Sequence, residues 1–222
     1  MDYIDNHILT EKQKKNLEEL VGKIKSVMSF DLYSHSIGTL KYAQKLAGIY
    51  LPEIEHAKSE KKDGGNISEN KSEIYYRLYI SCILHDYGKI FSYNELVKVA
   101  KENKLDISEF ELNCQSLIHS FVGDYLVKRD FGISDEKILK AIKFHTIGYC
   151  NMTLSDKILF VSDKIEENRD YESINNFRDL SIKNIDLCLL GIYRGTIIYV
   201  MKRSKLLHPD TSKIWNSICG GE

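Results

Sequence analysis

The chain has 222 residues, of which 43% are hydrophobic and 28% are charged, a balance typical of an ordinary globular protein in water. Its formal net charge of -1 provides no surplus of Lys and Arg for binding a polymeric nucleic acid. No apolar run approaches the roughly 18 residues of a membrane span, and the N-terminus lacks the apolar segment of a signal peptide. We therefore expect a cytoplasmic protein with neither a membrane nor a polymeric nucleic acid as partner.

The length suits one sizeable hydrophobic core, and the composition does not divide the chain into unlike halves. We therefore expect a single domain over residues 1–222. The five cysteines are scattered and never form a Cys-x-x-Cys pair, which argues against a disulfide framework and a zinc knuckle. They are expected to be reduced, mostly buried thiols.

The first predicted helix begins near Thr10, because Gln13 follows three residues later in a capping-box pattern and an apolar stripe comes next. A second helical stripe starts near residue 30 and is closed by Pro52. Residues 56–73 are polar and carry Gly64-Gly65 without periodicity, which predicts a flexible surface loop.

The rest of the chain continues with helical patterns and shows no convincing strand alternation, internal repeat or glycine-rich phosphate loop. These patterns cover residues 74–90, 94–103, 112–131, 135–145, 154–168 and 185–204, before a short closing segment around Trp215. The sequence therefore predicts an all-α fold, a helical bundle.

Several predicted helices place a polar, metal-competent residue on or beside an apolar face. These residues are His35, His85, Asp86, His119, His145 and Asp163. A lone histidine on such a face is more often a hydrogen-bonded core residue than a ligand. In a bundle, however, side chains from facing helices can converge on one point, and the whole set is then better explained by a bound metal.

The neighbours His85 and Asp86 point about 100 degrees apart on a helix, so they cannot act as an i, i+4 ligand pair. Their adjacency fits one metal that both reach from the side, or an aspartate that bridges two metals. Lys89 shares this helix surface and is either a phosphate-binding group beside the metal or an exposed lysine at a helix end.

The order His35, then His85-Asp86, then Asp163 resembles the motif of the HD-domain metal-dependent phosphohydrolases, and the additional His119 and His145 resemble the members that bind two metals. Within that superfamily the chain is similar to the YqeK branch over most of residues 30–218. The segments that carry this similarity are ILHDYGK, FHTIG, KILFVSDKIEENRD, DLCLL and HPDT.

The resemblance implies an HD-type helical bundle with its core at about 30–218. It also implies symmetrical hydrolysis of diadenosine tetraphosphate, a dinucleoside polyphosphate, to two ADP by a metal-activated hydroxide. The implied cofactor is a pair of divalent or mixed-valence metal ions, iron first, with manganese, cobalt or magnesium as alternatives. The implied ligands are His35, His85, Asp86 and Asp163 for one metal, with Asp86 bridging to a second metal held by His119 and His145.

Asp86 and Lys89 are the implied catalytic residues, and four positions match the phosphate-binding side of this branch. These positions are Lys89, Thr146, Gly148 and Arg169. The sequence departs from the family at Leu32 and Tyr149, where arginines are often found, and the loss of two cations bears on polyphosphate binding. Formation of a homodimer is left open.

Three rival interpretations remain at the sequence level. The same metal site could act on another nucleotide or phosphodiester, because fold and metal site do not select the substrate. The bundle could also be a nucleotide-sensing module without turnover. Finally, a structural helical protein with hydrogen-bonded core histidines would contain no transition metal.

Overall fold

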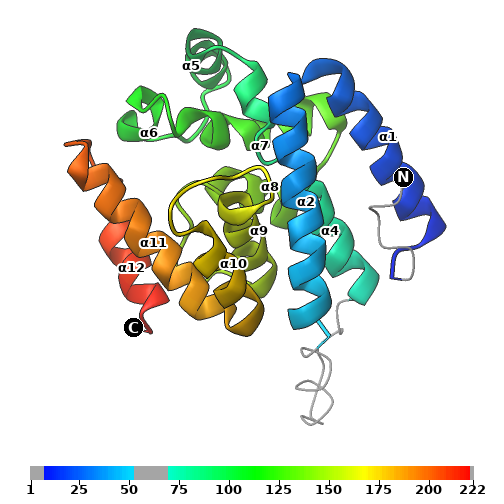
Figure 1. The fold of residues 1–222 in the computed structure, drawn as a ribbon. Helices are drawn as coiled ribbons and strands as arrows, with labels where there is room; N and C mark the ends of the chain where they lie inside the picture. The colour runs from blue at the N-terminus through cyan, green and yellow to red at the C-terminus, as the bar shows by residue number, and fades with distance from the viewer. Residues whose placement is uncertain (1–7, 53–69, 221–222) are drawn as a thin grey trace, which may run out of the picture.

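The computed structural model describes residues 8–52 and 70–220. In the described part of the chain there are helices and turns but no strands, which confirms the all-α fold. The helices, drawn in Figure 1, are α1 Glu11–Val27, α2 Phe30–Tyr50, α4 Lys71–Leu84, the 3-10 helix η1 Tyr87–Ile90, α5 Tyr93–Glu102, α6 Glu109–Asn113, α7 Ile118–Phe131, α8 Glu136–Phe144, α9 Leu154–Ile165, α10 Ile174–Lys183, α11 Ile185–Lys202 and α12 Thr211–Ile218.

The helices pack as a bundle around α2, which contacts both α4 and α9 along its length, while α7 packs against α8. Buried apolar residues from α1 through α12 form one hydrophobic cluster, in which Leu40, Ile83 and Val161 have no exposed surface. Figure 1 shows α11 and α12 at the opposite side of the bundle from α1. None of the described helices combines the length and the apolar character that a membrane crossing needs.

The first two helices begin and end where the sequence indicates. The Thr10 side chain accepts from the backbone N–H of Gln13, and the Gln13 side chain accepts from the backbone N–H of Thr10, so the predicted capping box is confirmed. Ser29 caps α2 in a similar way, and α2 ends at Tyr50, two residues before Pro52.

The polar loop predicted at 56–73 is too long at its C-terminal end. Residues 56–69 lie outside the described part of the chain, but Lys71, Ser72 and Glu73 form the first turn of α4. The sequence reading missed the side chain of Asn70, which accepts from the backbone N–H of Ser72 at 3.2 Å and starts the helix. Glu73 then accepts from the side chain of Gln13 at 2.8 Å, which ties α4 to α1.

Two predicted helices are interrupted in the structure, each shortly before a predicted ligand. The helix expected at 74–90 ends at Leu84, and the chain continues through Asp86 into η1. The helix expected at 112–131 is divided into α6 and α7. The sequence also missed α10, whose apolar positions are fewer and whose first turn has no side-chain cap.

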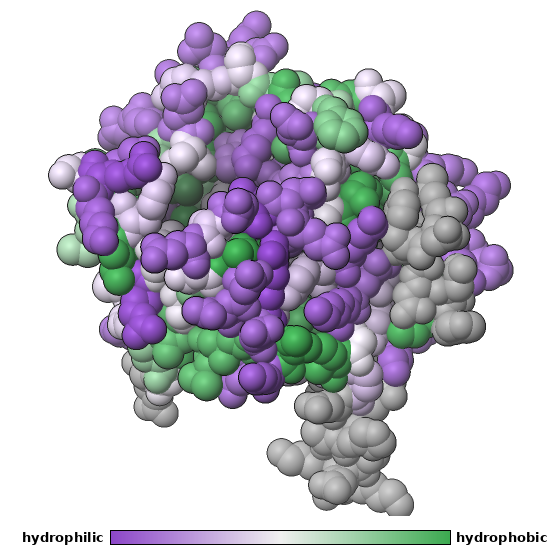
Figure 2. Space-filling model, viewed as in Figure 1, coloured by the Kyte–Doolittle hydropathy of each residue, from purple (hydrophilic) through white to green (hydrophobic). Residues whose placement is uncertain are grey.

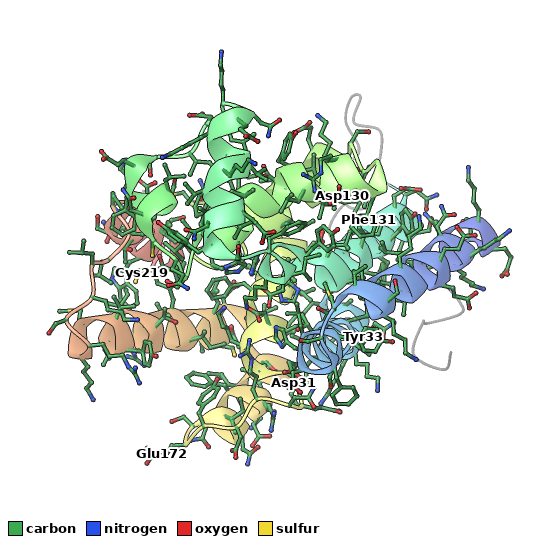
Figure 3. The ribbon with its side chains drawn as sticks, turned by 90° about the horizontal axis from the view of Figure 1, so that it is seen from above. Asp31, Tyr33, Asp130, Phe131, Glu172 and Cys219 are labelled. Carbon is green, nitrogen blue, oxygen red and sulfur yellow. The ribbon has the colours of Figure 1, made fainter. Side chains whose placement is uncertain are left out.

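All five cysteines are described and are free thiols, as expected from their spacing. The expectation that most of them are buried is wrong, because only Cys82 and Cys188 are buried. Figure 3 shows Cys219, just after α12, on the opposite side of the molecule from Phe131 at the end of α7.

Candidate metal centre

The bundle brings all six predicted ligands together at its centre. One comes from α2, one from the C-cap of α4, one from the residue between that cap and η1, one from the start of α7, one from the C-cap of α8 and one from α9. They form three overlapping groups whose ligand atoms lie within 4.8 Å of one another. These groups are His35, His85 and Asp86; His85, His145 and Asp163; and Asp86, His119 and His145.

One side of the cluster is formed by two histidines facing two aspartates. His35 Nε2 lies 3.0 Å from Asp163 Oδ1 and 3.4 Å from Asp86 Oδ2. His85 Nε2 lies 3.4 Å from the same Asp86 oxygen and 3.2 Å from His35 Nε2. Two imidazole nitrogens and two carboxylates thus surround a single point, the donor set that a divalent cation requires.

The other side of the cluster uses the second oxygen of Asp86. Asp86 Oδ1 lies 3.2 Å from His119 Nε2 and 3.3 Å from His145 Nε2. All three atoms are fully buried and none has a hydrogen-bond partner in the described structure. Buried polar atoms are normally paired. Three possible metal-ligand atoms that face one another without a hydrogen-bond partner therefore indicate a place for an ion.

The histidines at the ends of α4 and α8 are held in one orientation by the helices that precede them. His85 Nδ1 lies 2.8 Å from the carbonyl of Cys82, and His145 Nδ1 lies 2.8 Å from the carbonyl of Ile142. Carbonyls in the last turn of a helix lack intrahelical partners and accept such hydrogen bonds. Nδ1 therefore carries a proton that it donates to the carbonyl, and Nε2 faces the cluster.

The 3-10 helix η1 approaches α7 closely because residue 88 is glycine. A Cβ at Gly88 would lie 2.1 Å from the backbone oxygen of His119, which no other residue could tolerate. This contact sets the distance between Asp86 and His119. The adjacent His85 and Asp86 can both face the cluster because α4 ends at Leu84, His85 is its C-cap, and Asp86 adopts φ -100 and ψ 11.

His35 is oriented by a carboxylate that the sequence reading did not single out. Glu166 Oε1 lies 3.1 Å from His35 Nδ1, and only 1% of Glu166 is exposed. The other oxygen of Glu166 accepts from the backbone N–H of Asn168 at 2.8 Å. Gly38, one turn after His35, makes room for this carboxylate, since a Cβ there would lie 2.2 Å from Glu166 Oε2. Carboxylate partners of this kind fix the orientation of metal-binding histidines.

Three cations cover the open edge of the two aspartates. Lys89 Nζ lies 2.6 Å from Asp86 Oδ2, Lys164 Nζ lies 2.5 Å from Asp163 Oδ2, and Arg169 Nη2 lies 2.9 Å from Asp163 Oδ1. Their side chains are 43%, 26% and 39% exposed, so these groups face both the buried cluster and the solvent. Figure 3 shows Glu172, in the same α9–α10 connection as Arg169, pointing outward from the bundle.

Burial and charge divide the histidines into two kinds. Burial alone would lower the pKa of His35, but hydrogen bonds to Asp163, Asp86 and Glu166 raise that pKa to about 10. Burial lowers the pKa of His145 to about 4 and also lowers the pKa of His119. The His119 and His145 side is therefore neutral and ready to ligate at neutral pH, whereas the His35 side holds a proton that a metal would displace.

The two aspartates are ionised despite their burial. Desolvation would raise the pKa of Asp86, but the charge of His85 and the facing imidazoles hold that pKa well below its usual value. Asp163 behaves in the same way, with Lys164 as the main charge that lowers its pKa. Four imidazoles and two carboxylates fit hard or borderline metals. The nearby Cys82 offers no thiolate, because burial and the charge of Asp163 raise the pKa of its thiol.

The remaining predicted substrate residues lie beside the cluster. Thr146 directly follows His145, and its Oγ1 lies 3.0 Å from Ser120 Oγ. Gly148 is buried with φ +73, which accounts for a glycine at this position, and its N–H donates to the carbonyl of Phe144 at 2.7 Å. Their contacts with substrate stay predictions.

The two departures from the family pattern have different surroundings. Leu32 is half-buried and packs against the core, at the start of α2. The Tyr149 hydroxyl donates to Asp156, and the ammonium of Lys140 lies 3.7 Å from the centre of the Tyr149 ring. Tyr149 therefore connects α8 to α9. The cation at this position is the ammonium of Lys140 over the tyrosine ring, where the family often has the guanidinium of an arginine.

The family model of the HD domain matches residues 32–168, which include all six residues of the cluster. The chain belongs to the HD-domain family. Relatives of this HD-domain protein that match most of its length are named symmetrical bis(5'-nucleosyl)-tetraphosphatase. The protein of Bacillus subtilis is 30% identical over 93% of this chain and 99% of its own length. The protein of Halalkalibacterium halodurans is 30% identical over 84% and 88%, respectively.

A solved structure agrees with the fold of this HD-domain chain. It is the crystal structure of a "predicted HD superfamily hydrolase involved in NAD metabolism" from Clostridium acetobutylicum, with a TM-score of 0.76 and 25% sequence identity. The match covers 91% of this chain and 96% of that one. The HD-type helical fold is therefore confirmed, and with it the class of metal-dependent hydrolases.

Sequence reasoning missed Glu166 and Lys164. Glu166 follows Asp163 by three positions in a predicted helix, so the i, i+3 rule would have placed both on one face. Lys164 was hidden by its neighbour Asp163, since adjacent helix positions do not share a face. Its side chain nevertheless reaches Asp163 Oδ2, in the last turn of α9.

Proposed function

We propose that this protein hydrolyses diadenosine tetraphosphate symmetrically to two ADP, using two divalent metal ions bound by the His/Asp cluster. The observation that carries this proposal is the position of Asp86. One of its oxygens faces His35 and His85, and the other faces His119 and His145. This arrangement supports a carboxylate that bridges two ions, as hydrolases of phosphate esters and anhydrides often use.

The proposed ligands for the first ion are His35, His85, Asp86 and Asp163, and those for the second are Asp86, His119 and His145. A bound metal pair supplies a lowered pKa for water and neutralises charge on the phosphoryl oxygens. The carboxylate of Glu166 holds His35 in place through Nδ1 and leaves its Nε2 for the ion. Iron is our first choice of metal because the family resemblance implies it, and imidazole and carboxylate donors without thiolate suit iron and the alternatives manganese, cobalt and magnesium.

Lys89, Lys164 and Arg169 are proposed to bind the phosphate chain. Each is paired with Asp86 or Asp163, and each retains solvent-exposed surface. When the two carboxylates hold metal, Lys89, Lys164 and Arg169 would be free to contact phosphoryl oxygens. Cations fixed where negative charge moves during phosphoryl transfer lower the barrier without reorganisation. Thr146 is proposed as a further contact, beside the second ion.

The names of the relatives from Bacillus subtilis and Halalkalibacterium halodurans support the substrate and the symmetry of cleavage. The solved structure from Clostridium acetobutylicum, described as a hydrolase "involved in NAD metabolism", favours a second candidate, action of this site on a pyridine nucleotide. A cytoplasmic location and a single domain over residues 1–222 complete the proposal.

Chromatography of the products tests the proposed function. Diadenosine tetraphosphate should give ADP as the sole nucleotide, and NAD in a parallel reaction should remain intact. AMP with ATP would mean asymmetrical cleavage and would contradict the proposal. Cleavage of NAD at a higher kcat/KM than diadenosine tetraphosphate would favour the second candidate.

A further inference from the structure

A large cleft lies beside the metal centre, and no residue of the His/Asp cluster lines it. It has a volume of about 870 Å³ and is bounded by α6, the connection before α7, the residues after α8, α11 and the connection between α11 and α12. Figure 2 shows the surface hollowed between α6 and α11, with hydrophobic side chains visible inside. The volume falls within the range of roughly 300 to 1,000 Å³ that is typical of small-molecule sites.

The cleft meets the metal centre at the His119 and His145 side. Leu117, in its wall, precedes His119 by two residues, and Thr146, also in its wall, directly follows His145. The hydrogen bond between Thr146 and Ser120 joins these two segments at the boundary. A molecule with its phosphates on the metal centre would therefore have its next chemical group at the mouth of this cleft.

The walls of the cleft combine apolar surfaces with polar edges. Leu117, Ile147, Ile197 and Val200 are half-buried apolar residues on opposite sides, and Thr196 supplies a hydroxyl between them. Apolar faces that sandwich a ring, with a few hydrogen-bonding groups at its rim, are the surroundings that a purine nucleoside requires. The three cations of the metal centre are absent from this lining, and its one cation, Lys205, is exposed at the connection after α11, away from the boundary with the metal centre.

The outer wall of the cleft is fixed by contacts of its own. His208 Nε2 lies 3.0 Å from Glu111 Oε1, and the two side chains are 7% and 13% exposed. The His208 ring lies 6.1 Å from the Phe121 ring at an angle of 12°, and it meets Phe110 edge-on. The connection after α11 is thereby attached to α6 and α7, which makes the cleft a preformed site.

We propose that this cleft, here called the nucleoside cleft, binds one adenosine of the substrate while the attached phosphates reach the metal centre. This inference rests on the proposed function, because it assigns a place to one half of the dinucleotide. It assigns the two parts of the substrate to two regions of the protein. The His/Asp cluster and its cations recognise phosphate, and residues of α11 and the α11–α12 connection recognise the nucleoside.

Substitutions on α11 test this assignment. Val200→Trp places a large side chain into the nucleoside cleft, whereas Tyr199→Trp changes a neighbouring position that is 54% exposed and does not line it. Leu207→Trp fills the cleft from its opposite wall and serves if Val200→Trp does not fold, as judged by circular dichroism.

Calorimetry with metal-loaded protein compares ADP with inorganic pyrophosphate, which lacks the nucleoside. Wild type should bind ADP at least about tenfold more tightly, and Val200→Trp should lose about tenfold in ADP affinity, a typical effect of a misfit in an apolar pocket. Val200→Trp and Tyr199→Trp should both bind pyrophosphate as tightly as wild type does. Tyr199→Trp should also bind ADP as wild type does. Equal affinities of wild type for the two probes, or unaltered ADP binding by Val200→Trp, would overturn the inference.

Failure of the proposed function has a different signature. If wild type shows the ADP preference and Val200→Trp loses it, but diadenosine tetraphosphate is not hydrolysed, the nucleoside cleft stands and the proposed reaction is wrong. If diadenosine tetraphosphate gives two ADP with the same KM in wild type and Val200→Trp, the reaction stands and the nucleoside cleft is wrong.

Discussion

The metal centre and the nucleoside cleft are neighbours, but they are built from different parts of the helices. Five of the six proposed ligands of the metal centre are buried, and the orientation of three of its histidines is fixed by backbone carbonyls or by Glu166. The walls of the nucleoside cleft come from helix faces and connections that are half-exposed. Rigid, buried positions suit metal chemistry, whereas exposed connections can vary and set the substrate.

Asp86→Asn is expected to have the largest effect, because it acts on both halves of the metal centre at once. The amide replaces a carboxylate that faces four histidines. We expect loss of both metals and a fall in kcat/KM of more than about 10³-fold, beyond the 10–100-fold that residues behind the ligands typically cost. Elemental analysis and the ADP assay measure both quantities.

Asp130→Asn is the matched control, since this aspartate accepts from Tyr87 on the far side of η1 and does not face the cluster. It should keep the metals and the activity. Retention of one full metal equivalent by Asp86→Asn would mean that this carboxylate serves only one ion.

Lys89→Ala separates phosphate binding from metal binding within the same turn. We expect a loss of about 10²-fold in kcat/KM, the typical cost of removing one group that stabilises transition-state charge, with the metal content unchanged. Lys98→Ala, an exposed lysine on α5 that pairs with Glu102, should leave activity at the wild-type value. A metal-depleted Lys89→Ala protein would instead assign this lysine to holding Asp86 in place.

Gly38→Ala tests whether the support behind the metal ligands matters. The added Cβ would lie 2.2 Å from Glu166 Oε2 and push the carboxylate away from His35. We expect metal affinity to fall by about 10–100-fold, as measured by titration of metal-free protein with manganese or cobalt.

Gly48→Ala lies on the same helix and meets nothing within 4 Å, so it controls for the effect of alanine in α2. It should bind metal as wild type does and gain up to about 1 kcal/mol in free energy of unfolding from helix propensity. Equal metal affinities for the two variants would show that Glu166 does not position His35.

Proton release is the smallest expected effect and concerns the His35 side of the metal centre. With a pKa raised to about 10, His35 is protonated at pH 7 in metal-free protein, and a metal ion at Nε2 must displace that proton. Metal uptake should release at least one proton, and apparent affinity should rise about tenfold per pH unit between pH 7 and about 10 for each proton released. Calorimetry in two buffers with different ionisation enthalpies measures the release, and uptake without it would contradict the protonated state.

The contrast between the two regions also explains what the sequence could predict. His119 and His145 interrupt apolar stripes at helical spacing, and His85-Asp86 follows an apolar run, so periodicity alone exposes them as unusual. Thr10 and Gln13 predicted the first helix because a capping box is local. Features determined by a few adjacent residues were therefore predicted correctly.

Features that depend on distant contacts were missed or misplaced. Nothing local marks Gly38 as the space for Glu166, because the two are far apart in the chain. The break at Asp86 is supported by the contact between Gly88 and the backbone of His119, which belongs to another helix. The nucleoside cleft was invisible for the same reason, since its walls come from segments that only the fold brings together.

The measurement that tests the central claim most directly is the metal content of untagged wild-type protein purified without oxygen. The six proposed ligands include Asp86, whose two carboxylate oxygens face the two sides of the cluster. Elemental analysis should therefore find close to two metal ions per chain in protein that converts diadenosine tetraphosphate to ADP. Metal-free protein with full activity would contradict the account.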